Sequence, residues 1–150
     1  MSLYTIVLTV HSCLRWVALA AGVGATLTAI ADRSGGRAER WGLALTTALD
    51  LQMLIGLLLY LVLSPFTAEA LRDFSAAMKS PGLRFFAVEH ITMMFAAVIL
   101  AHLGRVLARK ASTPAAKRTR LIVCFGLATI LMIAGIPWPG MANGRPLFRV

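Results

Sequence analysis

Residues 3–31 read LYTIVLTVHSCLRWVALAAGVGATLTAIA, an apolar run that carries a single charged side chain, Arg15. A helix crosses the hydrocarbon core of a bilayer with about 20 apolar residues, so this run is long enough to span a membrane. It lacks the basic start of a signal peptide and is too long for the apolar part of one. We therefore expect a retained transmembrane helix here.

Three further apolar segments follow, at residues 41–63, 83–107 and 121–138. The whole chain is 59% hydrophobic and only 14% charged, which is outside the range of soluble globular domains. In hydrocarbon, a helix satisfies its backbone hydrogen-bonding groups within one segment, whereas an open strand cannot. The sequence thus predicts an all-α transmembrane four-helix bundle, formed by residues 1–150 as a single domain.

The connections between the four segments are short to moderate in length, which favours an up-down-up-down bundle with the first and third helices diagonally opposed. Residues 31–40 form a charged turn, and residues 108–118 form a basic hairpin interrupted by Pro114. Between the second and third helices, Thr67 to Lys79 carries apolar side chains at helical spacing. This loop is predicted to hold a short amphipathic helix at the membrane surface, or else a plain exposed loop helix.

The formal net charge of +9 comes from basic residues that border the apolar segments, so no nucleic-acid partner is expected. Lys and Arg are enriched in the cytoplasmic loops of membrane proteins. Nine basic residues flank the first and third connections: Arg33, Arg37, Arg40, Arg105, Arg109, Lys110, Lys117, Arg118 and Arg120. Five lie at the other ends of the segments: Arg72, Lys79, Arg84, Arg145 and Arg149. This bias predicts that both termini and the loop between the second and third helices lie outside.

Two histidines, His11 in the first segment and His90 in the third, are expected at the same depth. Counted from Tyr4 and from Leu83 at 1.5 Å per residue, each lies about 10 Å below the outer surface. Neutral imidazole is a good ligand for haem iron, and two such rings on diagonal helices can fill both axial positions of a b-type haem. The pattern predicts a haem b site with His11 and His90 as iron ligands. The alternative, that each histidine hydrogen-bonds a neighbouring helix, stays open.

Other side chains on the same helix faces are expected to contact this cofactor. They are Arg15 on the first helix and Phe86, Met93 and Met94 on the third. Arg15, at a depth of about 17 Å, is also level with Asp50 of the second helix at about 19 Å. Because a buried charge without a partner is costly, an Arg15–Asp50 ion pair is predicted.

Two ionisable residues of the third segment have less defined roles. Glu89 can orient a ligand, carry protons or pair with Arg84. His102 lies about 18 Å deeper than His90, so a second haem with two histidine ligands is not expected within one chain. A hydrogen-bonded or interfacial role is favoured for His102. The two cysteines fall inside apolar segments, and no Cys-x-x-Cys-His motif for covalent haem attachment is present.

The strings HSCLRW (residues 11–16), LRFFAVEH (83–90) and AGIPWP (134–139) resemble those of small bacterial four-helix membrane proteins catalogued as cytochrome b-like. The resemblance extends over nearly the whole chain. It implies a bundle with b-type haem and an electron-transfer role in the bacterial inner membrane. More distantly the layout looks like cytochrome b561 proteins and the b subunits of dehydrogenases and hydrogenases. Those commonly carry two haems, whereas this chain has histidines for one.

We therefore expect a membrane b-type cytochrome that passes single electrons between a quinone or quinol and a partner, the quinone being inferred by analogy alone. Whether it acts as a quinone-linked oxidoreductase or as an electron-transfer subunit stays open, and no catalytic residue is assigned. Beside the lipid bilayer, other membrane subunits or a second copy of the chain are candidate partners.

Two alternatives remain. One is a cofactor-free accessory subunit of a larger respiratory or photosynthetic membrane complex. In that case small residues would form helix contacts: Gly22, Gly24, Ala25, Gly126 and Gly135. The other is a small transporter or metal-handling protein that uses the intramembrane polar residues, although no broken helix or inverted repeat supports it.

Overall fold

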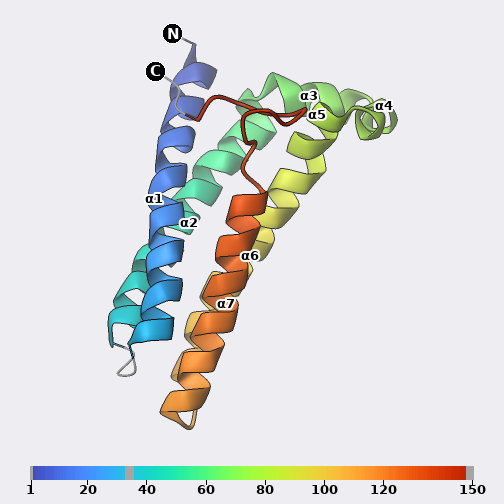
Figure 1. The fold of residues 1–150 in the computed structure, drawn as a ribbon. Coiled ribbons are helices and arrows are strands. Elements are labelled where there is room, and N and C mark those ends of the chain that lie inside the picture. Colours follow the sequence, from blue (N-terminus) through green and yellow to red (C-terminus); the bar gives the residue numbers. More distant parts are fainter. Residues whose placement is uncertain (1, 33–35, 148–150) are drawn as a thin grey trace.

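A computed structural model describes residues 2–32 and 36–147 of the chain, so Arg33 and Arg149 of the charge pattern lie outside the described residues. The described part is helical and contains no strand, which confirms the all-α prediction (Figure 1). Its long helices are α1 (Leu3–Ala31), α2 (Gly36–Leu58), α6 (His90–Arg109) and α7 (Pro114–Ala134). The short ones are α3 (Pro65–Arg72), α4 (Phe74–Lys79) and α5 (Pro81–Arg84), with π-helical turns η1 (Leu59–Leu63) and η2 (Phe85–Glu89).

Three helical stretches of the described residues are long and apolar enough to cross a membrane: Leu3–Ala31, Gly36–Leu63 and Pro81–Arg109. Helix α7 has 21 residues, but its first two turns carry three basic side chains. The apolar part that remains is shorter than the roughly 20 residues that span a hydrocarbon core. The long apolar helices indicate a multi-pass membrane protein in a lipid bilayer.

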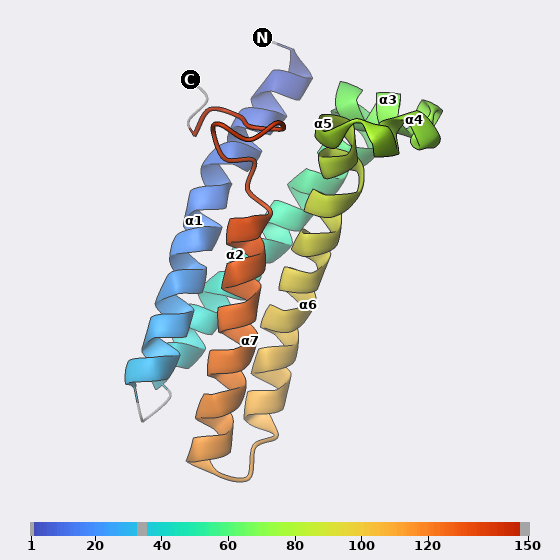
Figure 2. The same ribbon diagram turned by 45° about the vertical axis from the view of Figure 1, so that its right-hand side comes forward.

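The four long helices run in alternating directions, and the beginning of α1 lies at the same end as the segment after α7 (Figures 1 and 2). Helix α1 packs along α2 and α7, and α6 packs along the same two helices. Helices α1 and α6 therefore face each other across the interior. We call the end with α3, α4 and α5 the cap end. The opposite end, where α1 connects to α2 and α6 to α7, is the hairpin end.

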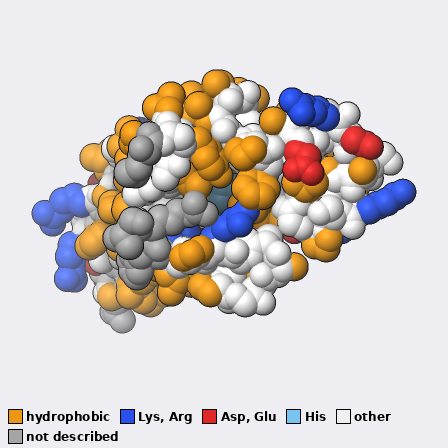
Figure 3. Space-filling view, turned by 90° about the horizontal axis from the view of Figure 1, so that it is seen from above, with side chains coloured by type: hydrophobic (Ala, Val, Ile, Leu, Met, Phe, Trp, Pro, Cys, Tyr) orange, Lys and Arg blue, Asp and Glu red, His pale blue; other side chains and the backbone are white. Residues whose placement is uncertain are grey.

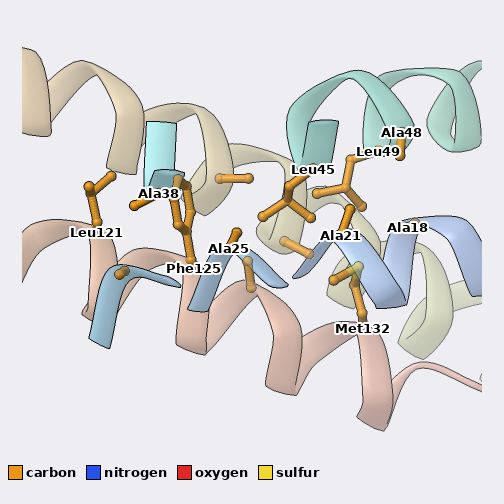
Figure 4. Packing of buried hydrophobic residues seen from close by; sticks show 14 of the residues in the cluster. Ala18, Ala21, Ala25, Ala38, Leu45, Ala48, Leu49, Leu121, Phe125 and Met132 are labelled. Carbon is orange, nitrogen blue, oxygen red and sulfur yellow. The ribbon is translucent and has the colours of Figure 1, made fainter. Parts of the chain in front are cut away.

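Small residues line the faces along which α1 and α6 meet their neighbours. On α1 the buried positions are Ala18, Ala21, Gly22, Ala25 and Ala29. On α6 they are Ala97, Ala101, Gly104 and Ala108. Spacings of three and four residues place each set on one face, and small side chains let helices approach closely in a membrane. Larger side chains such as Leu45 of α2 and Phe125 and Met132 of α7 fill the space between them (Figure 4).

The glycines named above for contacts with other subunits lie against side chains of this chain. A Cβ atom added at Gly22 would lie 2.5 Å from Met132 Cε, and one at Gly24 would lie 2.5 Å from Trp41 Cε3. Gly126 faces Thr26, and Gly135 faces Met94. These small residues therefore serve packing inside the chain. Because they face side chains of the same chain, they do not mark a surface for contact with another subunit.

Basic side chains at the hairpin end bind the last carbonyl groups of neighbouring helices. The Arg118 guanidinium donates to the carbonyls of Ala29 and Ile30 at the end of α1. Arg120 Nη1 donates to the Leu107 carbonyl of α6 at 2.7 Å. Cations at helix C-termini satisfy unpaired carbonyls and are attracted by the helix dipole. These contacts hold the start of α7 against α1 and α6.

The loop between α2 and α6 differs from the prediction of one amphipathic helix over Thr67 to Lys79. The chain breaks at Asp73, which has φ −137° and ψ 84°, and continues as a second helix. The Asp73 carboxylate caps this second helix by accepting from the backbone N–H of Ala76 at 2.9 Å. Asp favours such caps over helix interiors, so the prediction of a single helix is wrong. Leu71 and Phe74, on either side of the break, are exposed.

The run Pro-Trp-Pro-Gly after Ile136 predicts the end of the fourth helix, and α7 ends two residues earlier, at Ala134, because the chain leaves the helix at Gly135 and Pro137 cannot continue it. The segment that follows turns back across the cap end (Figure 1). It is tied to α1 at the Leu147 carbonyl, which accepts from Arg15 Nη2 at 2.6 Å and from Trp16 Nε1 at 3.3 Å. We call residues 135–147 the tail.

The close approach of α6 and α7 can be tested with two glycines. A Cβ at Gly104 would lie 2.6 Å from Cys124 Cβ, a clash that no side-chain rotation relieves. We expect Gly104→Ala to lower the free energy of unfolding by about 1–3 kcal/mol, as overpacking does. At Gly126 the nearest atom to an added Cβ is Thr26 Cγ2 at 3.8 Å, so Gly126→Ala should be neutral or slightly stabilising. Thermal unfolding in detergent measures both, and equal effects of the two substitutions would contradict this packing.

Candidate functional site

His11 of α1 and His90 of α6 face each other across the interior near the cap end. Their ring centroids are 6.3 Å apart, and the ring planes make an angle of 70°. His90 follows directly after the π-helical turn η2, in which its backbone N–H bonds to the carbonyl of Phe85 five residues earlier. Such turns reorient the side chains around them and are frequent at functional sites. The two predicted ligand residues are thus brought together from different helices.

A backbone carbonyl fixes the orientation of the His90 ring. His90 Nδ1 lies 2.7 Å from the carbonyl oxygen of Gly135, the residue that ends α7. A carbonyl only accepts hydrogen bonds, so Nδ1 carries the proton and donates it. The Nε2 atom of a neutral ring then keeps its lone pair. This second interaction is the one that metal-binding histidines typically make through their other ring nitrogen.

The His11 ring is positioned by α2. Gln52 Nε2 donates to the His11 backbone carbonyl at 3.0 Å and lies 3.4 Å from His11 Nε2. Gly56, one turn further along, makes room for the ring, because an added Cβ there would lie 3.2 Å from His11 Cε1. The buried Nδ1 of His11 has no hydrogen-bond partner among the described residues. Leaving a buried polar atom unsatisfied costs about 1–3 kcal/mol, so this ring is suited to bind a further group.

Both rings line two cavities. A main cavity of about 140 Å³ extends from them toward α1, the end of α7 and the tail, and a smaller one of about 40 Å³ extends into the groove between α2 and α6. Seen from the cap end, histidine lies in a hollow bordered by hydrophobic and basic side chains (Figure 3). Because α1 and α6 oppose each other, a flat group held between the rings would extend in these two directions.

The walls of the main cavity are largely apolar, with polar groups gathered near the cap end. Arg15 and Arg145 both line it. The Arg145 guanidinium lies over the rings of Phe66 and Phe86, at 4.5 and 5.3 Å from their centroids. Cation–π contacts of this kind hold a guanidinium in place while its edge stays available for hydrogen bonds. The cavity therefore joins an apolar interior to two positive charges near its mouth.

The predicted cofactor-contacting residues divide into two groups. Arg15, Phe86 and Met94 line the main cavity together with both histidines. Met93 does not line either cavity and lies beside Gly135, where an added Cβ would be 3.6 Å from Met93 Cβ. Successive residues of a helix point about 100° apart, so Met94 lines the cavity while Met93 does not.

The predicted Arg15–Asp50 ion pair is wrong. Asp50 Oδ1 instead lies 2.8 Å from His102 Nε2 of α6, and Arg15 donates to the Leu147 carbonyl of the tail. The two residues were matched by depth alone, which does not define the direction in which a side chain leaves its helix. Asp50 lies on the side of α2 that faces α6. His102 is accordingly a hydrogen-bonded residue, as favoured above, and Glu89 pairs with Arg84 at 2.7 Å.

Two elements of this site were missed by sequence reasoning: the Gly135 carbonyl and the Arg145 side chain. Gln52 was noticeable as a polar residue inside an apolar segment. Arg145 was counted only as a loop charge, because nothing in the sequence indicates that the tail returns to the cavity.

The two histidines do not form a complete site for a bare metal ion. The described residues contain no group of three or more His, Cys, Asp or Glu side chains that could hold one. A haem differs from a bare ion because its porphyrin supplies four nitrogen ligands and leaves only the two axial positions to the protein. A pair of opposed imidazoles is therefore compatible with haem and is a poor site for copper or zinc.

Double-mutant cycles can compare the Asp50–His102 contact with the Arg15–Asp50 pair that the sequence predicted. We expect Asp50→Asn and His102→Gln to be coupled by about 0.5–2 kcal/mol in the free energy of unfolding, because their side chains touch. Asp50→Asn and Arg15→Gln should be additive within about 0.5 kcal/mol. Chemical unfolding in detergent gives both couplings. A larger coupling of Asp50 to Arg15 than to His102 would contradict this arrangement.

No protein-family model, no curated protein and no solved structure matches this chain. The resemblance to cytochrome b-like proteins therefore stays a prediction from the quoted strings.

Proposed function

We propose that the chain is an integral membrane b-type cytochrome in which His11 and His90 hold one haem near the outer face. In this proposal α1, α2 and α6 cross the membrane, α7 completes the up-down-up-down transmembrane bundle with its basic first turns at the surface of the hairpin end, and single electrons pass between a quinone or quinol and a partner. The observation that carries the proposal is the 6.3 Å separation of the two imidazole rings, which both line the two cavities.

The facing rings support a shared ligand between them. His11 and His90, with ring centroids 6.3 Å apart, would each offer one imidazole nitrogen to the iron of a single haem. The Gly135 carbonyl fixes the proton of His90 on Nδ1 and so leaves the Nε2 lone pair available. Simple packing of two histidines does not require this arrangement. The hydrogen bond from His90 Nδ1 to Gly135 thus supports ligation over simple packing.

The remaining cavity residues have roles that follow from their chemistry. A haem has two carboxylate groups, which Arg15 and Arg145 near the cavity mouth would bind by charge-assisted hydrogen bonds. Phe86 and Met94 would pack against the apolar ring. The haem supplies reversible one-electron chemistry at its iron. The protein holds the proton on His90 Nδ1 and keeps the interior largely free of water.

We further propose that the cap end faces outward from the bacterial inner membrane. The hairpin end carries most of the basic residues among those described, and Lys and Arg are enriched on the cytoplasmic side. His11 lies about 12 Å from the start of α1 at the cap end, by the rise of a helix. A haem at this depth would exchange electrons with a partner on the outer side.

Absorption spectroscopy of the purified protein tests the cofactor. Protein from haem-replete cells should show a Soret band that shifts on reduction with dithionite. His11→Ala and His90→Ala should each abolish this spectrum, because each removes one axial ligand. His102→Ala is the matched control and should keep it, since His102 is bonded to Asp50 and lines neither cavity. A folded, colourless protein would contradict the proposal and favour the cofactor-free accessory subunit.

The role of the tail can be tested through the rate of haem loss. Arg145→Leu removes one cation from the cavity mouth, and we expect haem to leave the protein about tenfold faster. Transfer of haem to an excess of a haem-free globin measures this rate. Lys79→Leu is the control, because Lys79 is a cap-end cation that does not line the cavity. Equal rates for the wild type and Arg145→Leu would exclude a contact between this side chain and the haem.

A further inference from the structure

Gln52 is a buried amide in the apolar interior beside the facing histidines. It lies on α2, is only 8% exposed, and lines both cavities together with His11 and His90. An amide buried in a membrane-spanning helix is costly unless its hydrogen-bonding groups are used. The contacts of its amide nitrogen therefore indicate what Gln52 does for the site.

The backbone of α1 fixes the orientation of the Gln52 amide. One end of this amide lies 3.0 Å from the His11 carbonyl oxygen, and a carbonyl oxygen only accepts hydrogen bonds. The atom at this contact must therefore be the donor Nε2 and not the acceptor Oε1. The same nitrogen has a second N–H, and it lies 3.4 Å from His11 Nε2.

This second contact decides which nitrogen of the His11 ring carries the proton. A ring protonated on Nε2 would place two N–H donors against each other. The same conflict would arise in a doubly protonated ring. His11 Nε2 is therefore the acceptor, and the proton of the neutral ring lies on Nδ1. His90 has the same form, because its Nδ1 donates to the Gly135 carbonyl at 2.7 Å.

We infer that Gln52 is a positioning residue, which holds His11 in the Nδ1-protonated form so that both histidines offer Nε2 to one iron. Its role toward the iron rests on the proposed function, whereas the form of the ring does not. A ligating imidazole nitrogen must be free of a proton. The lone pair that Gln52 contacts at 3.4 Å is the one given to the iron, while the 3.0 Å bond to the His11 carbonyl keeps the amide in place.

Gly56, one turn after Gln52 on α2, restricts the same ring. An added Cβ there would lie 3.2 Å from His11 Cε1 and 3.8 Å from His11 Nδ1, so the ring packs closely against the α2 backbone. The 70° angle between the two ring planes thus has separate origins. The end of α7 orients His90 through Gly135, and α2 orients His11.

Nuclear magnetic resonance of the full-length protein in detergent, with isotope-labelled histidine nitrogens, tests the position of the proton. Protein from haem-depleted cells is used, so this readout does not depend on the cofactor. Correlation spectra distinguish a ring protonated on Nδ1 from one protonated on Nε2, and the variants His90→Ala and His102→Ala assign the signals. We expect both His11 and His90 to carry the proton on Nδ1.

Gln52→Met removes the N–H donor and nearly keeps the volume of the side chain. We expect the ratio of Nδ1-protonated to Nε2-protonated His11 to fall at least about fivefold, the effect of one hydrogen bond, while His90 does not change. Leu49→Met is the matched control. Leu49 lines the same two cavities one turn earlier on α2 and has no polar group, so this variant should leave both rings unchanged.

Electron paramagnetic resonance of the oxidised, haem-loaded protein gives a second readout. Ring planes about 70° apart should give a strongly anisotropic low-spin signal. In Gln52→Met the His11 ring loses the contact that orients it, so part of this signal should be replaced by a less anisotropic low-spin signal. Leu49→Met should keep the signal of the wild type.

The two readouts separate this inference from the proposed function. A His11 ring protonated on Nε2 in the wild type overturns the inference, and this result is available even if Gln52→Met does not fold. A folded Gln52→Met protein with an unchanged His11 proton or an unchanged low-spin signal also overturns it. A colourless wild type in which Gln52 holds the proton on His11 Nδ1 supports the positioning role and removes only the proposed haem.

Discussion

Two imidazole rings that face each other inside an otherwise apolar helical interior are the feature on which the account depends. Each ring is positioned by different contacts. The Gly135 carbonyl at the end of α7 orients His90, and Gln52 and Gly56 of α2 position His11. All four long helices therefore contribute to one small region. A change in the end of α7 or in the packing of α2 would alter the distance between the rings.

Hydrocarbon makes every polar side chain in these helices expensive, and most of them have local partners. Thr46 accepts a hydrogen bond from Arg105 at 2.9 Å, and Glu89 pairs with Arg84. Against this background, the facing histidines and the half-exposed Asp50–His102 pair stand apart. Asp50 and His102 satisfy each other at 2.8 Å, whereas the buried Nδ1 of His11 has no hydrogen-bond partner among the described residues. The smaller cavity between α2 and α6 reaches the facing histidines, whereas Asp50 and His102 line neither cavity.

Depth along a helix could be predicted from the sequence, but direction around it could not. Counting residues from the helix starts brought His11 and His90 to one level, because each lies within one continuous helical stretch, Leu3–Ala31 and Pro81–Arg109. The same counting paired Arg15 with Asp50, which lies on another side of α2. The proline and the basic residues predicted the hairpin at Pro114. The spacing of apolar residues predicted one helix over Thr67 to Lys79, but the cap formed by Asp73 divides it into two.

Contacts made by irregular segments were beyond sequence reasoning. The tail has no periodic pattern, so its return to Arg15 and the position of Arg145 in the cavity depend on turns that only the folded chain defines. The Gly135 carbonyl is a backbone group, so no residue type in the sequence indicates that it bonds to His90. Burial of small residues was easier to interpret, yet their partners turned out to be side chains of the same chain, such as Trp41 beside Gly24.

Electron paramagnetic resonance of the oxidised, purified protein tests the central claim most directly. Two imidazoles bound to one ferric iron produce a six-coordinate low-spin state. Ring planes about 70° apart, as found here for His11 and His90, should give a strongly anisotropic low-spin signal. We expect that signal in the wild type. A high-spin signal, or no haem signal from a folded protein, would contradict the account.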